Sequence, residues 1–159
     1  MPRWLGHRIP PPLIDLACAA LMWVLARWLP QAQWWPRGAS WLVWLVAIAL
    51  ALAGGLIALA GVHEFKRART TINPLAPQRT SSLVVGGVYQ YTRNPMYLGM
   101  LLVLIGWGVW LGNAAALVVG PLLAVLLLNT LQIGPEERVM REHFGDDYAR
   151  YAARVRRWC

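Results

Sequence analysis

The chain alternates between long, uninterrupted apolar runs and shorter polar segments. Residues 41–62 contain no charged residue and are long enough to cross a bilayer, which requires roughly 20 apolar residues. Residues 13–29 form a shorter run, and its two charged residues, Asp15 and Arg27, lie near its ends, where side chains reach the lipid headgroups. The pattern predicts a membrane-spanning helix in each run.

The third apolar region, residues 97–133, is too long for a single crossing. Gly112-Asn113 offers a tight turn in its middle and divides it into a helical hairpin of 97–111 and 114–133. The sequence therefore predicts an all-α integral membrane protein with about four transmembrane helices, of which the last two form a hairpin.

Composition agrees with this prediction. The chain has 159 residues, is 58% hydrophobic and only 14% charged, so residues 1–159 are expected to form a single membrane domain. The net charge of +8 by itself would suit a nucleic-acid partner, but no nucleic-acid-binding motif accompanies it. Attraction to membrane lipids and a topology signal explain the charge better.

Positive charge falls on one side of the predicted bilayer. With four spans, the N-terminus, segment 63–96 and the C-terminal tail share a side, and every Lys and Arg except Arg27 and Arg37 lies there. The positive-inside rule makes that side cytoplasmic. An active site built from the polar segments would therefore face the cytoplasm.

The C-terminal tail, residues 135–158, is predicted to be helical and amphipathic. Pro135 suits a first helical position, and Gly145 followed by Asp146 suggests a stop and a new helix start. An apolar stripe recurs at spacings of three and four: Met140, Phe144, Tyr148, Tyr151 and Val155. Such a helix can lie on the membrane surface or pack as a lid over segment 63–96, and the two arrangements are compatible.

Motifs of soluble enzymes are absent. The sequence has no phosphate-binding glycine loop and no serine-nucleophile motif. Its three histidines are scattered without metal-ligand spacing, so no metal is expected.

Residues 71–99 have a different character. The stretch is rich in turn-forming residues, yet it also carries apolar and aromatic side chains that a solvated loop would not need. Non-helical backbone at membrane depth must be buried in protein or line a cavity. The residues alone leave two interpretations open: a ligand site in the polar loop 63–96, or an ordered connection between spans.

Two motifs at this face resemble those of a known group of enzymes. Residues 93–99 read RNPMYLG, and after the hairpin come Glu136-Glu137 and the sequence FGDDYARY at 144–151. In this order the motifs resemble the superfamily of integral membrane methyltransferases that contains the isoprenylcysteine carboxyl methyltransferases and the phospholipid N-methyltransferases. The chain resembles a short bacterial member, which implies a multi-pass protein of a bacterial inner membrane.

The resemblance implies a cofactor, S-adenosyl-L-methionine, bound between the two motifs without a Rossmann domain. It implies catalytic roles for Arg93, Asn94, Tyr97 and Glu137. The implied cofactor contacts are Ser82, Leu83, Val84, Tyr89, Arg93, Asn94, Tyr97, Leu102, Glu136 and Glu137. A carboxylate suits the cofactor's ammonium or ribose hydroxyls, and an arginine suits its carboxylate.

The chain departs from the family pattern at two positions. Asn94 stands where the family has a histidine, and it can orient a ligand but cannot act as a base. Gln132 stands where the eukaryotic carboxyl methyltransferases have an arginine that suits a substrate carboxylate; it remains the candidate substrate residue, with hydrogen bonds but no charge to offer.

The resemblance thus implies an S-adenosylmethionine-dependent methyltransferase that acts on a small lipophilic or lipid acceptor. One alternative is a phospholipid amine N-methyltransferase. A second, from a different class, is a non-catalytic membrane scaffold or binding protein that keeps the fold. A transporter is disfavoured because residues 41–62 and the hairpin carry no charge.

Overall fold

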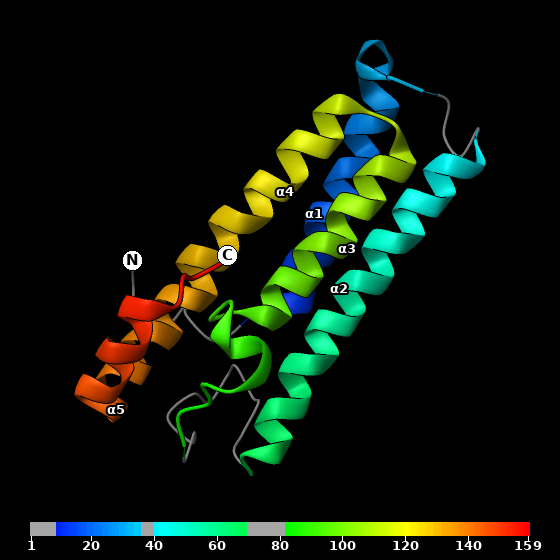
Figure 1. Cartoon of the computed structure of the whole chain (residues 1–159). Helices are drawn as coiled ribbons and strands as arrows, with labels where there is room; N and C mark the ends of the chain where they lie inside the picture. Colours follow the sequence, from blue (N-terminus) through cyan, green and yellow to red (C-terminus); the bar gives the residue numbers. More distant parts are fainter. Residues whose placement is uncertain (1–8, 36–39, 70–81) are drawn as a thin grey trace.

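A computed structural model describes residues 9–35, 40–69 and 82–159. The described residues are helical, apart from turns and short connections, and contain no strand beyond one isolated bridge, between Gln33 and Asn113. Figure 1 shows the long helices running along one axis, with a further helical element at one end. In chain order the elements are α1 (Pro11–Trp28), η1 (Pro30–Ala32), α2 (Trp41–Arg67), η3 (Gly87–Gln90), α3 (Pro95–Leu111), α4 (Ala114–Leu128), the π-helical turn η4 (Asn129–Ile133) and α5 (Gly134–Arg154).

The helix α3 is central and packs against α2 on one side and against α1 and α4 on the other. Small residues bring α2 and α3 together in an antiparallel pair. A Cβ placed on Gly54 would collide with the backbone oxygen of Gly99, and one on Gly106 would lie 2.9 Å from the backbone oxygen of Ala47. Close backbone approach of this kind is how helices associate in lipid, where apolar burial provides little attraction.

The turn between α3 and α4 lies where the sequence predicts it. Gly112 takes the left-handed conformation (φ 67°) that ends α3. The Asn113 side chain then caps α4 by accepting a hydrogen bond from the Ala116 amide at 3.0 Å, and it donates another to the Leu29 carbonyl at 2.8 Å. One side chain therefore fixes the hairpin and ties it to the end of α1.

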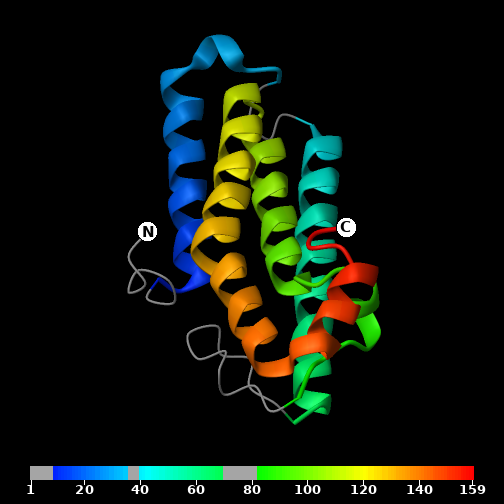
Figure 2. The ribbon, with the colours of Figure 1, turned by 90° about the vertical axis from the view of Figure 1, so that its left-hand side faces the viewer.

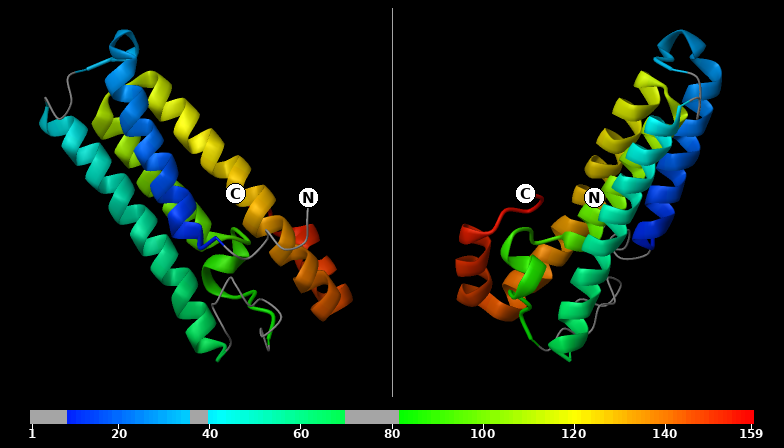
Figure 3. Two further views of the ribbon diagram at one scale, coloured as in Figure 1. Left: turned by 180° about the vertical axis from the view of Figure 1, so that it is seen from behind. Right: turned by 45° about the vertical axis from the view of Figure 1, so that its right-hand side comes forward.

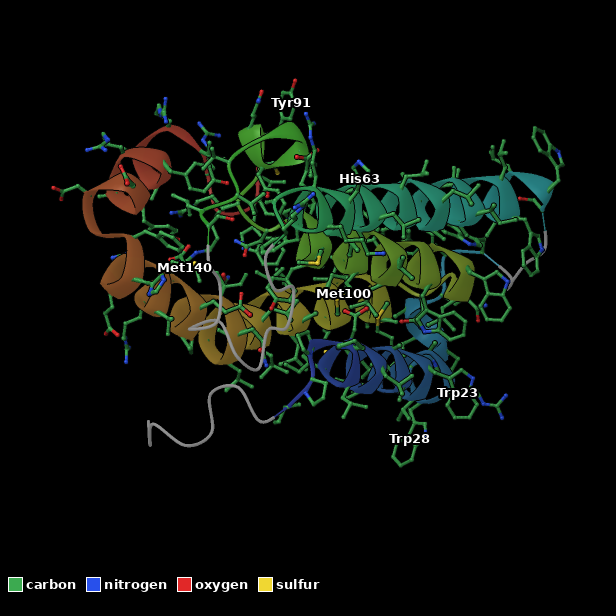
Figure 4. The ribbon with its side chains drawn as sticks, turned by 90° about the horizontal axis from the view of Figure 1, so that it is seen from below. Trp23, Trp28, His63, Tyr91, Met100 and Met140 are labelled. Atoms are coloured by element: carbon green, nitrogen blue, oxygen red, sulfur yellow. The ribbon has the colours of Figure 1, made fainter. Side chains whose placement is uncertain are left out.

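The predicted all-α membrane fold is confirmed. Among the described residues, three helices are long and apolar enough to cross a membrane, and the fourth apolar helix, α3, has 17 residues. Large apolar side chains point outward from the bundle; Trp23 and Trp28, for example, project from α1 and are 49% and 81% exposed (Figure 4). Such an outer surface suits lipid rather than water.

The helix boundaries differ modestly from the predicted ones. The helix α1 starts at Pro11 rather than at 13, α2 continues to Arg67 into the segment expected to be a loop, and α3 starts at Pro95. The predicted helix 114–133 consists of α4 and the π-helical turn η4. Residues 70–81 of the predicted loop lie outside the described residues.

The tail folds back on the bundle. In Figures 2 and 3, α5 turns away from the end of α4 and its second half lies beside η3. The reversal occurs at Gly145, whose backbone is non-helical (φ 48°, ψ −121°), as expected for a glycine stop. A buried cluster joins the second half of α5 to the polar segment: Val84, Tyr89, Tyr148, Tyr151 and Val155. This packing corresponds to the lid arrangement.

The prediction of helix as far as residue 158 was wrong at its end. The helix α5 stops at Arg154, and Val155 has extended backbone (φ −114°, ψ 130°). The last residues leave the helix because their carbonyls accept hydrogen bonds from residues 92–94 instead of from helical neighbours.

Candidate functional site

The first turn of α3 meets the first turn of α5 at the polar end of the bundle. Pro95 occupies the first helical position of α3, where its missing N–H costs nothing. Tyr97 follows within the first turn and is buried (7% exposed). Its hydroxyl donates a hydrogen bond of 2.5 Å to a carboxylate oxygen of Glu136. The two predicted motifs, 39 residues apart in sequence, are therefore in direct contact.

Glu136 has an unusual electrostatic environment. The pKa of its carboxyl group is raised to about 7, mainly by burial; the Tyr97 hydrogen bond opposes this rise, and the charge of Glu137 adds to it. No cation among the described residues forms an ion pair with it. A carboxyl group of this kind can hold or release a proton near neutral pH.

The neighbouring Glu137 has the opposite environment. It is 6% exposed and is surrounded by three arginines. Arg93 lies 3.2 Å from one carboxylate oxygen and Arg141 3.5 Å from the other. Arg157 binds both oxygens, at 3.0 Å and 2.6 Å, and this pairing raises the pKa of the guanidinium. Glu137 therefore connects the segment before α3, the helix α5 and the C-terminal segment by charge.

The C-terminal segment 155–158 closes over the start of α3. The backbone N–H of Arg93 donates to the Arg156 carbonyl at 3.0 Å. The Arg157 carbonyl accepts a hydrogen bond from the side-chain amide of Asn94 at 3.0 Å and another from the Thr92 hydroxyl at 3.3 Å. Asn94 thus uses a side-chain donor to position the chain end, and its backbone N–H bonds to the Thr92 hydroxyl at 3.2 Å.

Tyr89 lies near the contact between Tyr97 and Glu136 and interacts electrostatically with both residues. Its ring is buried (4% exposed) and packs edge-on against Phe65 of α2. Its backbone carbonyl accepts a hydrogen bond of 2.8 Å from the Tyr151 hydroxyl. Burial, followed by the nearby Tyr151, Glu136 and Glu64, raises the pKa of its hydroxyl, so this group remains a hydrogen-bond donor.

Three of the predicted site residues carry a buried polar atom without a partner among the described residues. These atoms are the Tyr89 hydroxyl, the Arg93 Nε and the Gln132 Oε1. Gln132 lies in the π-helical turn η4, and its other amide atom, Nε2, donates to the Ile9 carbonyl at 2.7 Å. Buried polar groups are rarely left unpaired in folded proteins, and π-helical turns often occur at functional sites.

The remaining predicted residues are distributed unevenly. Leu83 and Val84 pack in the cluster that contains Tyr89 and Tyr151. The Ser82 hydroxyl donates to the Ala68 carbonyl at the end of α2, at 3.3 Å. Leu102 lies on the face of α3 that meets Gly54 of α2, whereas Tyr97 belongs to the core cluster shared with α1 and α4. The structure thus groups most of the predicted residues around the start of α3, η3 and α5, leaves Ser82 at the end of α2 and Gln132 in η4, and sets Leu102 apart.

Residues that the sequence did not suggest complete the site. Arg157 binds Glu137, and Asn129 of η4 accepts hydrogen bonds from Trp158 at 3.2 Å and from Arg157 at 3.4 Å. Thr92 adds the contacts described above. The sole signal in the sequence was the concentration of arginine at 154–157, which does not indicate a partner.

The family of the chain follows from a comparison with known sequences. Residues 42–147, more than half of the chain, match the family model described as phospholipid methyltransferase. The chain belongs to the phospholipid methyltransferase family. The matched range starts within α2, contains α3 and α4, and ends in α5 just after Gly145. It thus includes residues 93–99, the Glu136-Glu137 pair and the start of the 144–151 sequence, and leaves α1 outside.

Individual relatives agree with this membership. An uncharacterized protein of Haemophilus influenzae is 46% identical over 63 residues, which are 40% of this chain and 98% of that protein. A probable protein-S-isoprenylcysteine O-methyltransferase of Oryza sativa subsp. indica is 29% identical over 115 residues, 72% of this chain. Protein-S-isoprenylcysteine O-methyltransferase B of Arabidopsis thaliana is 26% identical over 117 residues, also 72% of this chain. The matches cover 60% and 58% of the two plant proteins.

Proposed function

We propose that this family member is an S-adenosylmethionine-dependent membrane methyltransferase that acts on a lipophilic or lipid acceptor from the cytoplasmic side. The observation that carries the proposal is the contact between Tyr97 and Glu136, together with the buried polar atoms of Tyr89, Arg93 and Gln132 that have no partner among the described residues. A scaffold that only retained the fold would have no need to keep buried polar atoms without partners.

The donor set fits the proposed cofactor. Arg93 is fixed by Glu137, and its buried Nε has no partner among the described residues, which suits a carboxylate. Tyr89 offers a hydroxyl, and Glu136 offers a carboxylate for an ammonium or a ribose hydroxyl. When bound, the cofactor would supply a methyl group on a positively charged sulfur. Asn94 would act as a positioning residue, because its side chain binds the C-terminal segment.

The residues of the chain would contribute positioning, water exclusion and a proton site. The C-terminal segment and the second half of α5 cover the polar end of α3 and restrict water there. Glu136, with a pKa of about 7, would accept a proton from an acceptor oxygen or nitrogen. Tyr97 would hold that carboxylate in place through its hydrogen bond.

Gln132 favours one acceptor chemistry over another. Its amide N–H donates to the Ile9 carbonyl, whereas its buried Oε1 accepts from no donor in the part of the chain that the structure describes. An unpaired acceptor suits an N–H group of a substrate amine better than a substrate carboxylate, which needs donors. This observation favours amine methylation, as in the phospholipid amine N-methyltransferase alternative, over methyl-ester formation on a prenylated cysteine.

The proposal is tested by binding and by transfer. Purified protein in detergent is titrated with S-adenosylhomocysteine, and tritiated methyl transfer is measured to extracted lipids and to a prenylcysteine analogue. We expect binding, a base-stable product in the lipid fraction, and a transfer rate at least about tenfold lower in Tyr97→Phe, because the proton site loses its hydrogen bond.

The matched control is Tyr91→Phe, which removes a hydroxyl from an exposed side chain in the segment before α3 (76% exposed) and should change neither binding nor the transfer rate. Absence of S-adenosylhomocysteine binding, or binding without transfer to any lipophilic acceptor, would contradict the enzyme proposal. The second result would favour the non-catalytic binding protein.

A further inference from the structure

A groove runs between α1 and α3 on the outer surface of the bundle. Its cavity volume is about 360 Å³, within the range of roughly 300–1,000 Å³ typical of small-molecule sites. The walls are apolar and include Leu16, Ala19, Met100 and Trp107. Leu16 is 65% exposed, so the groove opens toward the surrounding lipid rather than into the core.

One charged residue interrupts this apolar wall. Asp15 of α1 lines the groove, and its Oδ1 is buried without a hydrogen-bond partner among the described residues. Nor does any described cation form an ion pair with it. An ionisable residue within a membrane span is costly unless it serves a ligand or finds a partner.

The groove lies next to the proposed active site. Met100 lines it and follows Tyr97 by about one turn of α3. Ile14, the neighbour of Asp15, packs in the same core cluster as Tyr97 and Ile133. The helices α1 and α3 both begin at this end of the bundle (Figure 1), so a molecule held at Asp15 with its chain in the groove would have its polar end at the same end as Tyr97 and Glu136.

We propose that this groove binds an amphiphile with a protonated primary or secondary amine, and that Asp15 recognises the amine by charge. The apolar walls would accommodate an aliphatic chain that enters from the bilayer. The unpaired carboxylate oxygen would accept the N–H donors. That this amphiphile is the methyl acceptor rests on the function proposed above; its binding does not.

The helix α1 makes the site a property of this chain rather than of the matched family region. The family match begins at residue 42, after α1 has ended at Trp28. The groove thus combines a wall from the family core, α3, with a wall from outside it. In this arrangement α1 would select the acceptor while α3 and α5 form the reaction site.

The test is photolabelling in lipid nanodiscs without any methyl donor. The probes are a dodecylamine that carries a diazirine on its chain and the corresponding dodecanol, and mass spectrometry quantifies label on residues 12–19 and 100–107. We expect the amine probe to label both segments and Asp15→Asn to reduce that label about tenfold, the loss expected for a hydrogen-bonded charge pair. The alcohol probe should label weakly and equally in both proteins.

Two further variants separate recognition from general damage. Glu142→Gln neutralises an exposed carboxylate on α5 and should leave labelling unchanged. Ala19→Phe fills the groove and should lower labelling by both probes. Equal amine labelling in Asp15→Asn and the unchanged protein would overturn the proposal, as would equally strong labelling by the alcohol, since the groove would then hold lipid chains without charge recognition.

The labelling result is independent of catalysis. Labelling as expected with no methyl transfer to any acceptor would refute the proposed function and leave the amine site in place. Methyl transfer together with equal labelling in Asp15→Asn and the unchanged protein would refute the amine site and leave the proposed function in place.

Discussion

The two ends of the helical bundle use polar side chains in different ways. At the hairpin end, Asn113 donates to the Leu29 carbonyl and accepts from Ala116, and the Trp35 indole donates to the Val109 carbonyl at 3.1 Å. The buried indole N–H of Trp110 is the exception there. At the opposite end, Tyr89, Arg93 and Gln132 each keep a buried polar atom without a described partner.

This difference separates structure from function within one small fold. Polar groups that satisfy one another hold the chain together and leave nothing to offer a ligand. Polar groups that are buried and unpaired carry a free-energy cost of about 1–3 kcal/mol each in the free protein, which a bound ligand can relieve. The hairpin end is therefore expected to govern stability alone, and the other end both stability and binding.

The largest effect is expected from Glu137→Ala. The substitution leaves Arg93, whose side chain is 13% exposed, without its counter-charge, and removal of one partner of a buried ion pair costs about 3–5 kcal/mol. Denaturant unfolding in detergent should register this loss, and S-adenosylhomocysteine binding should disappear with it. Arg141→Ala is the control. Because Arg141 is 63% exposed, this substitution should lower the free energy of unfolding by less than about 1 kcal/mol. Equal stability of the two variants would contradict the central role of Glu137.

The second prediction concerns pH. The folded pKa of Glu136 is raised from 4.5 to about 7, so between these values the folded state binds more protons than the unfolded state. Stability should therefore fall as the pH rises from about 4.5 to about 7. In Glu136→Gln this part of the pH dependence should vanish, as measured by unfolding at several pH values. A pH dependence that persists unchanged in the variant would assign it to other groups.

A smaller effect is expected at the hairpin end. Asn113→Ala removes the cap of α4 and the bond to Leu29, which should lower the free energy of unfolding by up to about 2 kcal/mol. Cofactor binding per folded molecule should not change. Asn113→Asp retains the cap of α4 but not the donor to Leu29, so it should lower the free energy of unfolding by less than Asn113→Ala does. Weaker cofactor binding in Asn113→Ala would contradict the proposal that the hairpin end governs stability alone.

Much of the architecture was predictable, because long apolar runs indicate the membrane spans and Gly112-Asn113 marks the turn between two of them. The motifs also singled out Arg93, Tyr97 and the glutamate pair as candidates, and the structure brings these residues into contact. The sequence did not indicate that Glu136 faces Tyr97 while Glu137 faces the arginines. Adjacent helical residues point about 100° apart, so their separate environments depend on how the helices pack.

The role of the chain end was not predictable in the same way. The apolar stripe of the tail continues to Val155, and this pattern favoured helix to residue 158. Instead, the Arg156 and Arg157 carbonyls bond to residues 92–94. Backbone carbonyls have no side-chain signature, so long-range contacts of this kind leave no pattern in the sequence.

The most direct test of the central claim is the dissociation constant of S-adenosylhomocysteine in Arg93→Lys. Lysine retains the positive charge beside Glu137 but removes the Nε donor that the structure leaves unpaired. The account predicts near-normal stability and about tenfold weaker binding, as expected for the loss of one hydrogen bond to a charged group. Unchanged binding in Arg93→Lys would show that this unpaired donor does not face the ligand and would contradict the account.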